Sequence, residues 1–355
     1  MLTPGATIGI LGAGQLGRML ALAAAELGLK CHIFAPENDS PALQVSAGHT
    51  VASFDDYGAL EVFARSVDVV TYEFENVPVE AVAFLEEIAP VRPGSKALAT
   101  AQDRLKEKHL ARSLGALTAE FSAVNSMDEL RLAVGRIGLP AVLKTNRFGY
   151  DGKGQAKILS ADDVAPAWAA MKNQPSILES FVNFQAEVSV IGARGLDGAF
   201  VAYDVTENVH RDHILHTSTV PAKIDAALAG RAIEIARGMA EALDYVGVMG
   251  TEFFVGDGLV YVNEIAPRVH NSGHWTQDAC VVSQFEQHIR AISGWPLGST
   301  KRHSDAVMTN ILGQDTAAWL DFAEKANSGL HLYGKAQSRE NRKMGHINVL
   351  TPRQG

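Results

Sequence analysis

The chain opens with a short apolar strand, a glycine-rich turn and a helix in direct succession. Residues 7–11 are apolar, the next six residues follow the pattern G-x-G-x-x-G, and residues 18–27 have the apolar spacing of a helix. A strand that enters a helix through such glycines predicts the first unit of a Rossmann-type domain with parallel strands. This opening restricts the first domain to the α/β class.

The ligand of the glycine turn is open at this point. In a dinucleotide-binding enzyme, an acidic residue after the second strand holds the ribose. Here residues 30–34 form the second strand, Ala35 and Pro36 follow it, and the nearest acid, Glu37, lies beyond the proline. The sequence therefore disfavours an NAD-dependent dehydrogenase. The same geometry can hold a phosphate or another substrate edge at the helix N-terminus, with Gln15 as a polar contact.

Composition indicates a globular protein with two or three domains. The chain has 355 residues and a formal net charge of −9, with basic residues scattered along most of its length, which argues against nucleic acid as the main partner. No apolar run approaches the length of a membrane span, and the first residues lack the features of a secretion signal. Cys31 and Cys280 lie far apart, so we expect no disulfide framework and a cytoplasmic protein.

A third predicted strand runs into an acidic loop within residues 67–78. Glu73 and Glu75 follow the apolar part of this segment. Carboxylates at the C-terminal end of a parallel strand point to ligand hydroxyls or amines, although a solvated loop explains this segment equally well. The character of the sequence changes near Ser95, where we place the first domain boundary.

The next part of the chain carries basic residues and a glycine-rich loop. Residues 101–114 predict a polar helix that includes Arg104, and residues 140–144 predict a strand that ends in Lys144. Three glycines then lie within six residues, beside Lys153. Backbone N–H groups of such a loop can surround phosphates, and the lysines supply charge. The loop matches neither the Walker pattern nor the kinase glycine-rich pattern.

Two further predicted strands carry acids. The backbone at residues 180–182 could contact an adenine edge, with Glu179 accepting from the adenine amino group and Glu187 holding ribose hydroxyls. Each acid alone is more often an ordinary strand-end charge. His210, His213 and His216 suggest a metal site, but the metal-ligand spacings H-x-x-x-H and H-E-x-x-H are absent, so hydrogen-bonding histidines are the better interpretation.

Residues 248–255 and 259–265 predict a β-hairpin around Gly256, Asp257 and Gly258. With a three-residue turn, Glu252 and Glu264 are diagonal neighbours on one face. Two such carboxylates repel one another unless a cation lies between them, and oxygen ligands beside a phosphate suit Mg²⁺. A two-residue turn would put the glutamates on opposite faces, and a solvated edge hairpin is the alternative.

Polar side chains crowd the segment after the hairpin, and basic ones crowd the end of the chain. Arg268, His270, Asn271, Ser272, His274 and Trp275 follow Pro267 with little helical or strand period, as in a binding loop. Residues 231–243 and 283–292 predict amphipathic helices, and a β-rich tail follows Pro296. Its basic cluster of Lys335, Arg342 and Lys343 is commonly a solvated end, but it suits a substrate phosphate.

Together these motifs resemble the ATP-grasp superfamily, and within it the family of 5-(carboxyamino)imidazole ribonucleotide synthases. The resemblance is carried by residues 12–19 (GAGQLGRM), 72–78 (YEFENVP), 149–155 (GYDGKGQ) and 263–276 (NEIAPRVHNSGHWT), and so spans nearly the whole chain. It implies an α/β and α+β protein. A Rossmann-like pre-ATP-grasp domain would cover residues 1–97, an ATP-grasp domain residues 98–295 with a flexible lid at about 115–175, and a small β-rich C-terminal domain residues 296–355.

The resemblance also implies the ligands of each group of residues. ATP would be held by Arg104, Lys144, Gly149, Tyr150, Asp151, Gly152, Lys153, Gly154, Gln155, Glu179, Ser180, Phe181, Val182, Glu187, His210, Asn263 and Glu264. The ribonucleotide would contact Gln15, Leu16, Glu73, Arg268, His270, Asn271, Ser272, Lys335, Arg342 and Lys343. The catalytic residues would be Tyr150, Asp151, Lys153, Arg268 and His270. Mg²⁺ would lie on Glu252 and Glu264; many relatives have a metal-binding Asn two residues after the second Glu, where this chain has Ala266.

The implied reaction is the carboxylation of the exocyclic amine of 5-aminoimidazole ribonucleotide in purine biosynthesis. It would consume ATP and bicarbonate, pass through carboxyphosphate and release ADP and phosphate, and the family implies a homodimer. The nearest rival is another ATP-grasp carboxylate–amine ligase. A nucleotide-sensing protein with a degenerate site is a third possibility, against which the retained glutamates, Lys144 and glycine loop argue.

Overall fold

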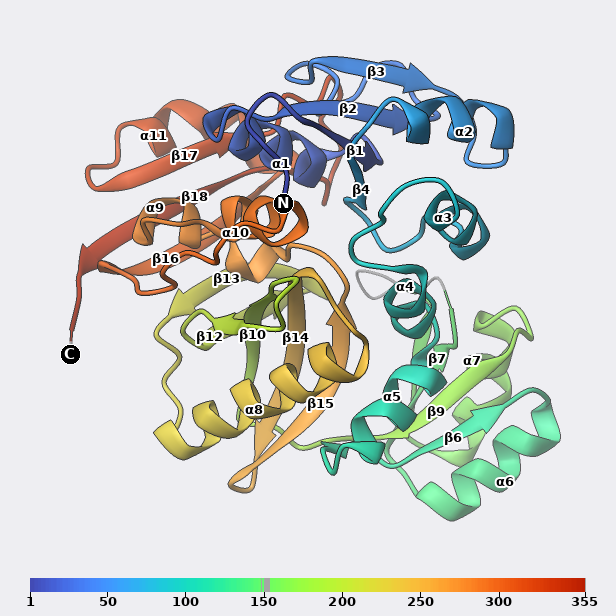
Figure 1. Cartoon of the computed structure of the whole chain (residues 1–355). Coiled ribbons are helices and arrows are strands. Elements are labelled where there is room, and N and C mark those ends of the chain that lie inside the picture. Colours follow the sequence, from blue (N-terminus) through green and yellow to red (C-terminus); the bar gives the residue numbers. More distant parts are fainter. Residues whose placement is uncertain (148, 150–153, 355) are drawn as a thin grey trace.

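The structure is a computed structural model that describes residues 1–147, 149 and 154–354. The strands of this described part form three sheets, which follow one another in the colours of Figure 1. Tyr150, Asp151, Gly152 and Lys153, which we predicted to bind ATP, lie outside the described residues. The predicted catalytic roles of Tyr150, Asp151 and Lys153 fall outside them as well.

The N-terminal sheet is parallel, with strand order β3-β2-β1-β4, as the Rossmann-type opening predicts. Its elements are β1 (Thr7–Leu11), α1 (Gln15–Glu26), β2 (Lys30–Ala35), β3 (Gly48–Val51), α2 (Tyr57–Arg65), β4 (Val69–Tyr72) and α3 (Val79–Glu86). Gly12 has φ 101°, a conformation that few other residues adopt, and it turns the chain from β1 into α1. The sheet therefore presents the loops after β1 and β4 at one edge.

The central sheet has ten strands among the described residues. Its order is β17-β18-β16-β13-β12-β10-β14-β15-β5, with β11 beside β10. The strands are β5 (Leu117–Thr118), β10 (Ala186–Arg194), β11 (Phe200–Ala202), β12 (Thr206–Arg211), β13 (Ile214–Val220), β14 (Gly247–Gly256), β15 (Leu259–Ala266), β16 (Ser304–Leu312), β17 (Ser328–Leu332) and β18 (Lys343–Pro352). Because β16 pairs with β13, the β-rich tail extends the central sheet instead of forming a sheet of its own.

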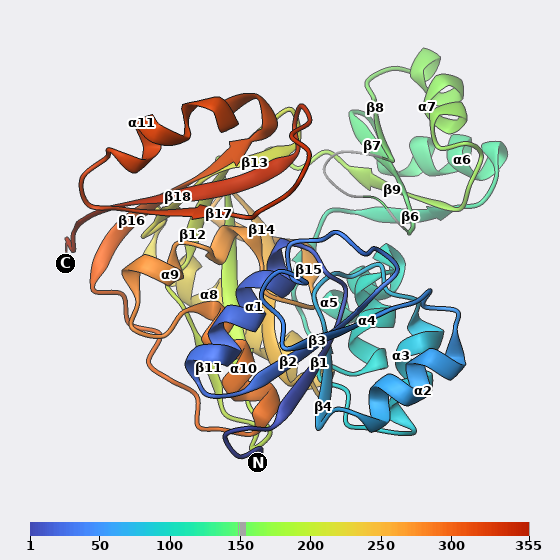
Figure 2. The same ribbon diagram turned by 90° about the horizontal axis from the view of Figure 1, so that it is seen from above.

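A third, smaller sheet has its own hydrophobic core. Its antiparallel order is β6-β9-β7-β8. The elements are β6 (Phe121–Val124), α6 (Met127–Ile137), β7 (Ala141–Thr145), β8 (Gln155–Ile158), α7 (Val164–Ala170) and β9 (Ser176–Ser180). Leu130, Leu143, Trp168 and Leu178 are buried together in this core. Figure 2 shows this small sheet with α6 and α7 on one side of the molecule, away from the C-terminal strands. We call it the lid sheet.

The remaining helices join the sheets. They are α4 (Ser95–Ala101), α5 (Arg104–Ser113), α8 (Ala226–Ala242), α9 (Thr276–Ala279), α10 (Gln284–Ser293) and α11 (Trp319–Ala323), with short 3-10 turns η1 (Ala161–Asp163), η2 (Asn271–Gly273) and η3 (Gly313–Ala318). The single helix predicted over residues 101–114 begins instead at Arg104, because the Asp103 carboxylate caps it by accepting from the backbone N–H groups of Leu105 and Lys106.

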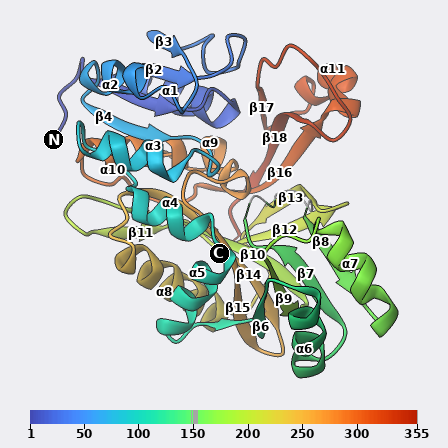
Figure 3. The ribbon, with the colours of Figure 1, turned by 90° about the vertical axis from the view of Figure 1, so that its right-hand side faces the viewer.

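Helix α10 ties the N-terminal sheet to the central sheet. The buried His288 ring accepts from the backbone N–H of Val248 on β14 at 3.0 Å, and its other nitrogen lies 2.9 Å from the Thr71 hydroxyl on β4. Apolar side chains of both sheets and of α10 share one core, including Ile8, Val248 and Phe285. Figure 3 shows the N-terminal strands above α10 and the strands β10, β14 and β15 of the central sheet below it. These two parts of the molecule therefore form one packed body.

The turn of the β14–β15 hairpin is shorter than we predicted. Gly256 pairs with Leu259, so the turn consists of Asp257 and Gly258, both with positive φ (52° and 72°), as a type I′ turn requires. A regular ladder from this turn would put Glu252 and Glu264 on opposite faces. The register shifts next to Glu252, however, and this β-bulge brings Glu252 directly opposite Glu264. The predicted three-residue turn and diagonal pair are wrong, but the two carboxylates still meet.

Within the described ranges, no helix combines the length and apolar character that crossing a lipid bilayer requires.

Candidate active site

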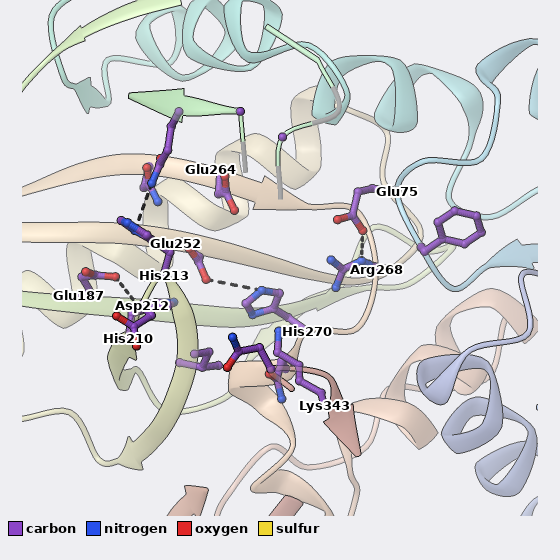
Figure 4. A pocket seen from close by; sticks show the side chains of 18 of the residues that line it. Glu75, Glu187, His210, Asp212, His213, Glu252, Glu264, Arg268, His270 and Lys343 are labelled. Carbon is purple, nitrogen blue, oxygen red and sulfur yellow. Dashed lines mark hydrogen bonds and ion pairs between the residues drawn. The ribbon is translucent and has the colours of Figure 1, made fainter. Parts of the chain in front are cut away.

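A cavity of about 990 Å³ lies where the three sheets meet. Figure 4 shows side chains from several of these elements turned towards it. Twenty of the residues predicted from the sequence line this cavity: Gln15, Leu16, Glu73, Arg104, Lys144, Gly149, Gly154, Gln155, Phe181, Glu187, His210, Glu252, Asn263, Glu264, Arg268, His270, Asn271, Lys335, Arg342 and Lys343. Glu179, Ser180, Val182 and Ser272 are described but do not line it.

The Glu252–Glu264 pair places two carboxylates side by side in the cavity. Burial, followed by the charge of Glu264, raises the pKa of Glu252 to about 7. Arg104 donates to Glu264 at 3.0 Å, but it bonds no oxygen of Glu252 among the described contacts. Two adjacent carboxylates of which one resists ionisation fit a divalent cation, because the cation would offset the repulsion that raises the pKa.

One end of the cavity combines a carboxylate–histidine pair with aromatic rings. His210 Nδ1 lies 2.7 Å from Glu187 Oε2, as Figure 4 shows. Burial alone would lower the pKa of His210, but the hydrogen bond and charge of Glu187 raise it. Phe184 and Phe254 stack with ring centroids 4.6 Å apart beside this pair. Such a surface offers an apolar face and polar hydrogen-bonding partners to a nucleoside.

Glu179 has a different environment from the one we expected. Its side chain is buried, and its carboxylate contacts Lys144 Nζ at 2.8 Å and Lys108 Nζ at 3.5 Å. Burial would raise the pKa of Glu179, but the two lysines lower it to about 2. We predicted that this carboxylate accepts from an adenine amino group; in this structure it instead holds Lys144 in place at the cavity wall.

Lys108 is fully buried behind the hairpin strand β15. Its ammonium group donates to the backbone carbonyls of Val262 at 3.2 Å and Asn263 at 2.9 Å. Since Lys108 also contacts Glu179 on β9, it joins the lid sheet to the strand that carries Glu264. No local sequence pattern distinguishes Lys108 as a residue of the site.

The glycine turn between β1 and α1 holds a carboxylate of the protein itself. Glu73 accepts from the backbone N–H groups of Gly14 at 2.8 Å and Gly17 at 3.0 Å. A Cβ atom on Gly12 or Gly14 would lie 2.6 Å from the Glu73 side chain, so these glycines leave room for the carboxylate. A dinucleotide pyrophosphate would need the same N–H groups. The occupied turn therefore disfavours NAD binding more directly than the missing ribose-binding acid does.

Arg268 is held by Glu75, the second acid of the loop that follows β4. Its guanidinium group donates to the Glu75 carboxylate, as Figure 4 shows. Burial would raise the pKa of Glu75, but Arg268 lowers it to about 2. The ion pair links the loop after β4 to the loop after β15.

His270 points into the cavity from the segment after β15. Its Nε2 atom lies 3.5 Å from Glu252 Oε1 (Figure 4). Its backbone N–H donates to Gln284 Oε1 at 2.9 Å, and its carbonyl accepts from Gln284 Nε2 at 2.7 Å. Ser272 is fully buried behind His270. The Ser272 side chain, which we predicted to contact the substrate, therefore lies behind the cavity wall and not on it.

The predicted basic cluster reaches the same cavity from the C-terminal strands. Lys335, Arg342 and Lys343 line it together with Tyr333 and Asn341. The Lys335 ammonium group donates to the carbonyl of Lys343 at 2.6 Å, which links the β17–β18 connection to the start of β18. Asn271 exchanges two side-chain hydrogen bonds with Asn310, at 2.8 and 3.0 Å.

Some cavity residues could have been found from the sequence and others could not. Phe254 is two residues after Glu252 on one strand, so the period of two predicts that both face the cavity. Glu75 follows Glu73 in the acidic loop and carried the same signal. Phe184, Asp212 and Lys157 reach the cavity only through the relative placement of the lid and central sheets, which no local pattern encodes.

Comparisons with known proteins cover almost the whole chain. Residues 5–102 match the ribonucleotide synthetase preATP-grasp domain, residues 109–285 the ATP-grasp domain, and residues 306–355 the phosphoribosylaminoimidazole carboxylase C-terminal domain. The chain is 50% identical over 355 residues to the N5-carboxyaminoimidazole ribonucleotide synthase of Brucella melitensis, covering 99% of this chain and 98% of that protein.

Solved structures agree with this match. An ADP complex of an N5-carboxyaminoimidazole ribonucleotide synthetase has a TM-score of 0.96 and 44% identity, covering 99% of this chain and 94% of the other. The enzyme of Aspergillus clavatus in complex with ADP and 5-aminoimidazole ribonucleotide has a TM-score of 0.92 and 33% identity, covering 98% and 94%. The chain therefore belongs to the N5-carboxyaminoimidazole ribonucleotide synthase family of ATP-grasp ligases.

Proposed function

We propose that this ligase joins bicarbonate to the exocyclic amine of 5-aminoimidazole ribonucleotide and consumes one ATP. The observation that carries the proposal is the composition of the cavity. It combines a carboxylate pair, Glu252 and Glu264, with Lys144 on the lid side and a basic cluster on the C-terminal side. Two groups of cations on either side of a carboxylate pair suit two phosphate-bearing substrates that meet between them. The Aspergillus clavatus relative, which holds ADP and 5-aminoimidazole ribonucleotide, supports this interpretation.

We assign the nucleotide to the lid side of the cavity. Glu187 and His210 would contact the ribose, Phe184 and Phe254 would line the base, and Lys144 and Arg104 would face the phosphates. The ribonucleotide would lie near Glu73, Arg268 and His270, with its phosphate on Lys335, Arg342 and Lys343.

The domain limits 97/98 and 295/296 remain sequence predictions. Strands β13 and β16 lie on opposite sides of the second limit and pair in one sheet.

The chemistry follows from the poor electrophilicity of bicarbonate. A bicarbonate oxygen attacks the γ-phosphorus of ATP, ADP leaves, and carboxyphosphate forms; the amine nitrogen then attacks its carbon, the C–O bond to phosphate breaks, and the amine loses a proton. Lys144 and Arg104 would stabilise the charge that develops on the transferring group. Mg²⁺ held by Glu252 and Glu264 would neutralise phosphate charge.

We also propose that the enzyme is cytoplasmic and forms a homodimer. Cys31 and Cys280 are both free and buried, which fits a reducing compartment. The dimer is an inference from the family. Size-exclusion chromatography with light scattering would measure the oligomeric state.

The proposed reaction is tested by identifying the product. The purified enzyme is incubated with ATP, Mg²⁺, 5-aminoimidazole ribonucleotide and ¹³C-bicarbonate, and the carboxylated ribonucleotide is detected by NMR. We expect ¹³C on the exocyclic nitrogen. Incorporation of formate or an amino acid in place of bicarbonate would instead indicate another carboxylate–amine ligase of the same superfamily.

A further inference from the structure

We propose that a buried chain of hydrogen-bonded side chains holds His270 in the tautomer with its ring proton on Nε2. In this tautomer Nε2 donates a hydrogen bond into the cavity, and Nδ1 is unprotonated and accepts. The chain consists of Ser218, Asn208, Ser189 and Ser272, and we call it the serine–asparagine chain. Each of its members is at most 5% exposed. The four residues come from β13, β12, β10 and η2, behind the cavity wall that His270 completes.

The contacts along the chain are continuous. Ser218 Oγ lies 2.8 Å from Asn208 Oδ1, and Asn208 Nδ2 lies 3.1 Å from Ser189 Oγ. Ser189 Oγ lies 2.6 Å from Ser272 Oγ, and Ser272 Oγ lies 2.8 Å from His270 Nδ1. Asn208 and Ser218 are direct partners in the β12–β13 ladder, so the pairing of the sheet sets this alignment.

The direction of the chain follows from one group that can only donate. The backbone N–H of Ser272 points at His270 Nδ1 at 3.4 Å, so Nδ1 is an acceptor. The short Ser272–His270 contact then takes its hydrogen from the Ser272 hydroxyl, and Ser272 accepts from Ser189. A hydroxyl has one hydrogen, so Ser189 in turn accepts from the Asn208 amide, and the Asn208 oxygen accepts from Ser218. Every link therefore donates towards His270.

This direction restricts what His270 can do. Its proton lies on Nε2, the nitrogen that is 3.5 Å from Glu252 Oε1 and that faces the cavity. A substrate atom beside Nε2 must therefore be an acceptor, such as an oxygen of a phosphate or carboxylate group. For the proposed reaction, which this last step assumes, His270 orients or stabilises an oxygen and does not remove the amine proton. Ser272, Ser189 and Asn208 are positioning residues that act through it.

The tautomer itself is measured without any activity. The protein is labelled with ¹⁵N-histidine, and the His270 signals are identified by their loss in His270→Gln. We expect a two-bond ¹⁵N–¹H pattern in which Nε2 carries the proton and Nδ1 does not. A proton on Nδ1 in the native protein would overturn the inference, whatever reaction the enzyme catalyses.

A nearly isosteric substitution reverses the chain. In Asn208→Asp the carboxylate can only accept, so Ser189 would donate to it, Ser272 to Ser189, and His270 Nδ1 to Ser272. These three shorter contacts outweigh the 3.4 Å contact of the Ser272 backbone N–H, which would be left without an acceptor. We expect the Nδ1 signal to become that of a protonated nitrogen and kcat to fall by roughly 10²-fold or more, as for other wrong-tautomer histidines. The matched control, Ser218→Ala, removes the first donor and leaves the direction unchanged. An unchanged tautomer in folded Asn208→Asp would contradict the proposal.

A second pair of variants tests the donor role at the cavity. Glutamine can place an N–H near the position of Nε2, whereas asparagine reaches only the position of Nδ1. We expect the kcat of His270→Gln to be at least about tenfold higher than that of His270→Asn, because a tenfold difference in rate corresponds to about one hydrogen bond. Equal loss in both variants would contradict the donor role while leaving the carboxylation reaction itself intact.

Discussion

At the scale of single residues, Glu252 is a carboxyl group whose ionisation the folded protein disfavours. Its folded-state pKa is about 7, against an ordinary value of 4.5, so the folded protein binds an extra proton between these pH values. The free energy of unfolding therefore falls as the pH rises from 4.5 to about 7. Without a divalent cation, we expect Glu252→Gln to be more stable than the native protein at pH 8, by up to about 3 kcal/mol at ~1.4 kcal/mol per pKa unit.

Urea unfolding at pH 8 and pH 4.5 measures this difference, which should vanish at the lower pH. Added Mg²⁺ should stabilise the native protein at pH 8 and have little effect on the variant. A native protein that is the more stable of the two at pH 8 without metal would show that Glu252 is not strained.

The partner glutamate tests the catalytic side of the same pair. Glu264→Gln removes a charge from the candidate cation site and from the ion pair with Arg104. We expect the ATP turnover rate to fall by at least about 10²-fold. Glu241→Gln, which changes an exposed glutamate on α8, is the control. Near-normal turnover of Glu264→Gln with Mg²⁺ would exclude the assignment.

At the scale of elements, the turn from β1 into α1 is built around Glu73. A Cβ atom at position 14 would lie 2.6 Å from Glu73 Oε1, so Gly14→Ala should displace the carboxylate. We expect KM for the ribonucleotide to rise by about tenfold, because the displaced carboxylate would lose about one hydrogen bond to this substrate. KM for ATP should not change. Gly230→Ala on α8, where a Cβ atom meets nothing within 4 Å, is the matched control. A parallel rise in both KM values would place Glu73 outside the ribonucleotide site.

The β14–β15 hairpin illustrates what sequence patterns can and cannot predict. Alternating apolar residues around Asp257 and Gly258 predicted both strands, because a strand period and turn chemistry are local properties. The bulge at Glu252 has no such local signature, and it changes which side chains face each other. The parallel N-terminal sheet was predictable for the same local reason. The burial of Glu179, Lys108 and Ser272 depends on contacts between sheets and was not.

At the scale of the whole molecule, the cavity joins the N-terminal sheet, the lid sheet, the central strands and the C-terminal tail. Arg342 and Lys343 line this cavity from the C-terminal tail. We expect Arg342→Ala combined with Lys343→Ala to weaken ribonucleotide binding, at roughly 1.5–3 kcal/mol for each charge-assisted contact, with little change for ATP. Separate titration of each substrate at saturating levels of the other measures the two effects, with Arg339→Ala as control. Loss of ATP affinity alone would place the cluster in the nucleotide site.

The central claim is that both substrates and ATP react within one cavity, and ADP formation tests it most directly. The release of ADP is followed with ATP and Mg²⁺ present while bicarbonate and 5-aminoimidazole ribonucleotide are omitted in turn. We predict that sustained turnover requires both, with one ADP formed for each carboxylated ribonucleotide. ADP release that proceeds equally well without either compound would contradict the account.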